Sequence, residues 1–173
     1  MYNKTINALD KVMMDTIALI KGSNEKLINT IPFEGSWTAA QVARHLIKAA
    51  TDMPALFIKY APETDRQPDE NVAEIKSILL DFDRKMVSPD GIVPEEKYYT
   101  IEELITDTDK IRQENLEALK TAQLNQVPTL QDWNPLNGYT KLELLHFVLY
   151  HTQRHNRQIN KIIEKVHQGQ PSL

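Results

Sequence analysis

The chain has 173 residues, which suits one domain built around a single hydrophobic core. Its net charge of −4 argues against a general nucleic-acid binder, because such proteins normally present a basic face. It contains no cysteine, which excludes disulfides, cysteine-ligated zinc and a cysteine nucleophile. Any thiol chemistry would therefore need a thiol supplied by a cosubstrate.

The first residues lack the apolar core of a signal peptide, and no apolar run approaches the roughly 18 residues of a membrane span. We therefore expect a cytoplasmic protein without membrane or nucleic-acid partners. No repeat, linker or low-complexity tract divides the sequence. We treat residues 1–173 as one domain.

Apolar residues recur at helical spacing almost throughout, which predicts an all-α protein. A first helix is expected from Asn3 to Ile28, before the break at 32–35. Its apolar stripe steps by three and four residues through Ile6, Leu9, Met13, Ile17 and Ile20.

A second helix is expected from Thr38, which forms a capping box with Gln41. Pro54 should kink this helix or remove one of its hydrogen bonds. A shorter third helix should follow, because the same spacing continues through Val72, Ile75, Leu79, Phe82 and Met86.

Residues 88–99 contain Pro89, Gly91 and Pro94 and are expected to form a loop. A fourth helix should start at the capping box of Thr100 and Glu103 and run to about residue 122. After a second loop, the last helix should start at the capping box of Thr140 and Glu143 and end near Gly169.

Two histidines of the last helix, His151 and His155, lie four residues apart and therefore project from one face. Both fall in the apolar seam that should face the interior. His45 lies in the seam of the second helix and would complete a three-histidine metal site with an open position for water or substrate. Alternatively, these imidazoles are core residues satisfied by a carboxylate or water. His146 points about 140° away from His151 and cannot join them.

Two further polar residues are candidates for catalysis. Gln158 lies one turn beyond His155 and either orients an imidazole or a metal-bound water, or only bonds a neighbouring helix. Asp52 lies two turns beyond His45 as a candidate general base, although a solvated surface carboxylate is the more common case.

Three residues are candidates for the wall of a pocket. Thr108 and Asn115 interrupt the apolar stripe of the fourth helix, and either line a pocket or fix the register of the helices. Trp37 should pack at the entry of the second helix and could form part of the cavity wall. Trp133 could cover the mouth of the bundle, whereas Arg154 and Arg157 should lie on a solvated face.

Three sequence segments resemble the DinB superfamily. One is the segment 36–46, in which Trp37 precedes a helical His-Leu pair at His45 and Leu46. The others are residues 139–145 at the start of the last helix and the late HxxxHxxQ pattern of His151, His155 and Gln158. The resemblance implies a four-helix bundle of up-down-down-up topology, here with one additional short helix. It also implies a nickel or zinc ion held by His45, His151 and His155, and a homodimer.

Proteins similar in this way include thiol S-transferases that use bacillithiol, a mycothiol-dependent isomerase and proteins described as metal-dependent hydrolases. We therefore expect a metal-dependent enzyme that activates a low-molecular-weight thiol or water for attack on a small-molecule substrate. The alternative is a non-catalytic bundle that binds a metal or a small ligand, or serves as an interaction protein under stress.

Overall fold

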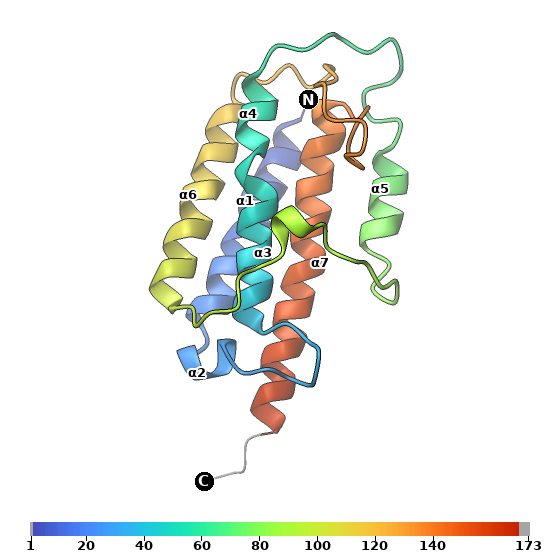
Figure 1. Ribbon diagram of the computed structural model, residues 1–173. Coiled ribbons are helices and arrows are strands. Elements are labelled where there is room, and N and C mark those ends of the chain that lie inside the picture. The colour runs from blue at the N-terminus through green and yellow to red at the C-terminus, as the bar shows by residue number, and fades with distance from the viewer. Residues whose placement is uncertain (1, 170–173) are drawn as a thin grey trace.

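The structure is a computed structural model that describes residues 2–169. Four long helical segments lie side by side (Figure 1). They are α1 (Asn3–Lys21), α3 (Ala39–Thr51) continued by α4 (Met53–Ile58), α6 (Ile101–Leu119) and α7 (Lys141–Gln168). Three shorter elements are α2 (Glu25–Ile28), α5 (Val72–Leu79) and the 3-10 turn η1 (Asp90–Ile92). The described residues form no strand, so the expected all-α class is confirmed.

The directions of the long helices match the up-down-down-up topology that the family resemblance implies (Figure 1). α1 and α7 run in one direction, whereas α3–α4 and α6 run in the other (Figure 1). α1 packs against α6 and α7, α3 packs against the same two helices, and α5 lies on the outside of α7. None of the helices in the described residues combines the length and apolar character needed to cross a membrane.

The first helix ends earlier than expected. It was predicted to continue to Ile28, but α1 ends at Lys21 and Gly22 is its C-cap. The chain then turns, and Asn24 starts the separate helix α2 by accepting a hydrogen bond from the backbone N–H of Leu27 at 2.9 Å. An asparagine cap satisfies one of the free donors at a helix start, so it favours a new helix over a continued one.

The predicted interruption at Pro54 divides α3 from α4. A proline has no N–H, so Pro54 cannot donate to the carbonyl of Ala50 one turn earlier. Asn115 of α6 replaces that donor, because its Nδ2 lies 3.3 Å from the Ala50 oxygen and 2.8 Å from that of Ile111. The fully buried Asn115 thus links α6 to the break in the neighbouring helix.

Two of the three predicted capping boxes are complete. Thr38 with Gln41, and Thr140 with Glu143, each exchange both hydrogen bonds. At the start of α6, Thr100 accepts from the N–H of Glu103, but no reciprocal bond forms. The carboxylate of Glu103 instead pairs with Lys97 in the preceding loop, so the third box is half formed.

The apolar spacing predicted a third helix that extends to Met86, but α5 ends at Leu79. Phe82 and Met86 lie beyond it and are exposed. Arg154 of α7 stabilises the irregular chain by donating to the carbonyls of Leu79, Asp81 and Arg84. Arg154 is therefore half-buried and bonded to backbone, which corrects its assignment to a solvated face.

Candidate metal centre

Three histidines from two helices meet inside the bundle. His45 projects from the middle of α3 and is 3% exposed, and His151 and His155 project from successive turns of α7. The Nε2 atom of His151 lies 3.3 Å from Nε2 of His45 and 3.2 Å from Nε2 of His155. One ring nitrogen of each histidine lies within 4.8 Å of the others, so this cluster could hold a metal ion.

The outer nitrogens of two imidazoles face hydrogen-bond acceptors. His45 Nδ1 lies 2.9 Å from the carbonyl oxygen of Ile92 in η1, and His155 Nδ1 lies 2.7 Å from Oε1 of Gln158. A carbonyl oxygen can only accept, so each Nδ1 carries the proton. In a neutral ring the proton then cannot also be on Nε2, and both Nε2 lone pairs point toward His151.

This donor set fits a divalent ion. Two nitrogen ligands of a tetrahedral zinc ion lie about 3.3 Å apart, given Zn–N bonds of about 2.0–2.1 Å. The spacings of His151 Nε2 from His155 Nε2 and from His45 Nε2, 3.2 and 3.3 Å, match that value. The nitrogen of His151 can donate to at most one of its neighbours, which would leave a buried lone pair without a partner. A shared cation satisfies all three.

Burial keeps the three imidazoles neutral. Burial lowers the pKa of His45. It lowers the pKa of His151 well below the ordinary value, and the neighbouring His155 and His45, together with Arg154, lower it too. Burial and the nearby His45 lower the pKa of His155 to about 4. Neutral imidazole is the form that binds a metal, so the ligand set is ready at neutral pH without loss of protons.

Two aromatic side chains cover the imidazole rings. Phe147, one turn before His151, stacks on that ring with centroids 5.3 Å apart and an interplanar angle of 14°. Trp37 lies 5.2 Å from His45, centroid to centroid. Trp37 was predicted as a wall residue, whereas Phe147 was missed, although its spacing of four residues from His151 could have indicated the contact.

Gln158 lies where its orienting role requires, but Asp52 does not join the cluster. Asp52 is exposed at the junction of α3 and α4, two turns from His45. No hydrogen bond links Asp52 to the three histidines among residues 2–169. Ser88, in the loop just before η1, is closer to the histidines than Asp52, because its Oγ lies 3.5 Å from Nδ1 of His45. Neither Ser88 nor the carbonyl of Ile92 was predicted.

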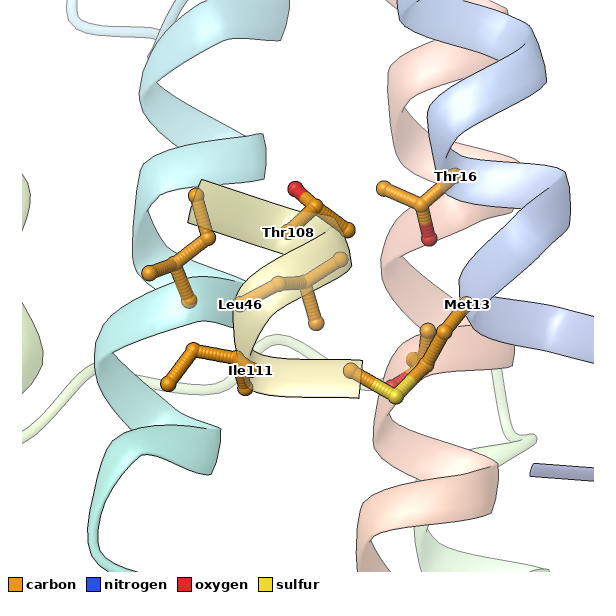
Figure 2. A pocket seen from close by; sticks show the side chains of 7 residues that line it. Met13, Thr16, Leu46, Thr108 and Ile111 are labelled. Atoms are coloured by element: carbon orange, nitrogen blue, oxygen red, sulfur yellow. The ribbon is translucent and has the colours of Figure 1, made fainter. Parts of the chain in front are cut away.

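The predicted pocket residues Thr108 and Asn115 lie elsewhere in the core. Thr108 borders a small cavity of about 10 Å³, room for about one water, and its hydroxyl donates to the carbonyl of Leu104. Figure 2 shows the labelled side chains of that cavity, contributed by α1, α3 and α6: Met13, Thr16, Leu46, Thr108 and Ile111. Asn115 instead donates to the carbonyl of Ala50 at the break between α3 and α4.

The other histidines and the second tryptophan stay outside the cluster. His146 packs against Tyr150, with ring centroids 5.5 Å apart, and His167 is exposed near the end of α7. Trp133 is 79% exposed in the loop before α7. Trp133 therefore does not pack over the interior of the bundle in this structure.

Comparison with known proteins identifies the family. The family model of the DinB superfamily matches residues 8–159, which include all three clustered histidines and Gln158. Neither the search of curated proteins nor that of solved structures found a match. The match covers most of the chain and agrees with the bundle topology and the histidine cluster. The chain therefore belongs to the DinB superfamily.

Proposed function

We propose that this chain is a metal-dependent enzyme in which His45, His151 and His155 hold one nickel or zinc ion. The observation that carries the proposal is the convergence of three neutral imidazoles, with Nε2 of His151 at the spacing of tetrahedral ligands from Nε2 of both His45 and His155. Three protein ligands leave a coordination position for an exogenous group, as in catalytic rather than structural zinc sites.

The charge around the cluster favours an anionic partner. All three ligands are neutral, so they leave the charge of a divalent ion uncompensated. Lys48 and Arg154 add positive charge nearby, and both contribute to the lowered imidazole pKa values. A bound ion would act as a Lewis acid that lowers the pKa of a thiol or water ligand. This environment suits a thiolate from a cosubstrate, since the chain has no cysteine.

The residues around the histidines have distinct roles in this proposal. The carbonyl of Ile92 and the amide oxygen of Gln158 hold the protons of His45 and His155 on Nδ1, so that Nε2 stays free to bind. Trp37 and Phe147 pack against the imidazoles and exclude water from their faces. Both proposed reactions, thiol transfer and hydrolysis, would use this arrangement.

Metal content tests the ligand assignment. The purified chain should hold about one divalent ion per molecule by elemental analysis, and His151→Ala should lose it. His167→Ala is the matched control, because it removes an exposed histidine from the same helix and should leave the metal in place. Full occupancy in His151→Ala would contradict the assignment.

A panel of low-molecular-weight thiols with a generic electrophile tests the chemistry, alongside a panel of hydrolysable esters and amides. Native protein should accelerate one panel above the uncatalysed rate, and His45→Ala should return it to background. Equal rates in the two proteins would contradict metal-centred catalysis. Metal binding without acceleration of either panel would favour the non-catalytic binding function instead.

A further inference from the structure

A second group of polar residues lies at the other end of α7. Lys141 occupies the first position of this helix, ten residues and about 15 Å before His151. Its side chain is only 1% exposed, which is rare for a lysine. Among residues 2–169 Lys141 forms no ion pair, so its ammonium group is buried without a counter-charge.

Two of the three ammonium donors have partners. Lys141 Nζ lies 2.7 Å from the carbonyl oxygen of Lys59, at the C-terminal end of α4, and 2.7 Å from Oε1 of Gln126. The contact with Lys59 explains part of the burial, since a cation is stabilised at the end of a helix. A lysine carries three N–H donors, so one remains for another acceptor.

Lys141 also fixes the orientation of two amides. Gln126 must turn its oxygen to the ammonium, which directs its Nε2 to Gln123 at 2.6 Å. The accepting atom of Gln123 must then be its oxygen, and the amide nitrogen of Gln123 is left to donate elsewhere. The hydrogen-bonding groups of Lys141, Gln126 and Gln123 that remain free are therefore mostly donors, and Lys141 adds one positive charge.

These groups line a cavity of about 120 Å³. Lys141 and Gln126 are its buried polar members, and Tyr60, Thr121 and Gln123 are exposed at the surface. Phe57 and Ile58 supply an apolar wall. An engineered apolar cavity of about 150 Å³ accommodates benzene, so this one has room for an ion of about five heavy atoms.

We propose that this cavity is a binding site for a small oxyanion, such as a carboxylate, sulfate or phosphate group, separate from the histidine cluster. The anion supplies the counter-charge that the protein does not provide to Lys141. It accepts from the third ammonium donor and from the amide nitrogens of Gln123 and Gln126, and the hydroxyl-bearing residues Thr121 and Tyr60 line the same cavity.

Sulfate is a suitable probe, because it is a weak ligand of zinc and nickel and keeps its charge across the neutral range. The full chain is titrated with sodium sulfate against sodium chloride at equal ionic strength, and NMR follows the amide signals of Gln123, Gln126 and Lys141. We expect saturable shifts of these signals in sulfate only. Shifts that grow linearly with sulfate, or that chloride reproduces, would overturn the proposal.

Three variants localise the effect. Lys141→Met should abolish the saturable shifts, and Thr121→Val with Gln123→Leu should weaken binding roughly five-fold or more. Lys120→Met is the matched control, because it removes an exposed lysine one residue before Thr121, and it should change binding less than about two-fold. Should Lys141→Met fail to fold, the double variant decides, because the ammonium group of Lys141 bonds to Lys59 and Gln126 and to neither of the two substituted residues. Unchanged binding in the double variant would overturn the proposal.

Discussion

The contact between His155 and Gln158 determines which nitrogen of this imidazole is available to a metal. Gln158→Ala removes the acceptor of the Nδ1 proton, so the ring can change its tautomer or rotate. We expect zinc affinity to fall roughly 10- to 100-fold, measured by competition with a chromophoric chelator. Gln153→Ala, a glutamine of the same helix outside the cluster, should leave the affinity unchanged. Equal affinities in the two variants would refute the orienting role.

The residues of the cluster differ in how well the sequence predicts them. Helical spacing alone brings His151 and His155 to one face, because the geometry of a helix is local. The seam position of His45 made it a credible partner, and the family resemblance identified it. The carbonyl of Ile92 was unpredictable, because every residue carries the same backbone oxygen and only the path of the loop brings this one to His45.

At the scale of the helix, starts were predicted better than ends. Thr38 and Thr140 form the expected capping boxes, since a cap and its partner lie three residues apart. The end of α5 at Leu79 depends instead on Arg154, which is 75 residues away in the chain. No pattern near residue 79 encodes that contact, and the apolar spacing of Phe82 and Met86 wrongly suggested a longer helix.

The link between Asn115 and the break at Pro54 can be tested by a double-mutant cycle. Asn115→Ala removes one donor to the carbonyl of Ala50, which keeps only the backbone N–H of Asp52, and should cost about 0.5–1.5 kcal/mol in urea unfolding. In a Pro54→Ala background the backbone N–H of residue 54 can take over this role, so the same substitution should cost measurably less. Equal costs in the two backgrounds would show that the asparagine acts independently of the proline.

At the scale of the molecule, the histidine cluster joins parts that are distant in sequence. His45 lies on α3 and is bonded to η1, while His151 and His155 lie on α7. A ligand that binds only the folded chain stabilises it, by about 4 kcal/mol at a free concentration of 1,000 times Kd. Zinc or nickel should therefore raise the Tm in a concentration-dependent way, and His151→Ala should abolish the rise. An equal rise in His151→Ala would place the stabilising ion elsewhere.

The topology of the whole bundle was predicted from the family resemblance alone. Helical periodicity indicates where helices occur in the sequence, but it does not indicate how they are arranged in space. The directions of α1, α3–α4, α6 and α7 agree with it (Figure 1). The homodimer and the cytoplasmic location stay predictions, and sedimentation of the purified chain would test the former.

One buried ion pair ties the loop after α4 to the start of α7. The side chain of Glu143 is fully buried and accepts from both terminal nitrogens of Arg66 at 2.6 Å, and from the N–H groups of Asn71 and Thr140 at 2.8 Å. Burial raises the pKa of Glu143, but these hydrogen bonds outweigh it and hold the pKa below its ordinary value. Between the two pKa values the unfolded chain therefore binds the proton more readily than the folded chain.

This pair should make the protein sensitive to acid. The stability that ionised Glu143 contributes is fully present above the unfolded-state pKa, near 4.3, and is lost as the pH falls through the lower folded value. Glu143→Gln should cost roughly 1.5–3 kcal/mol at pH 7 and show a shallower loss of stability below about pH 5, measured by urea unfolding at stepped pH. Glu164→Gln, an exposed carboxylate of the same helix, should follow the native curve. Parallel curves for native protein and Glu143→Gln would mean that other carboxylates govern the acid transition.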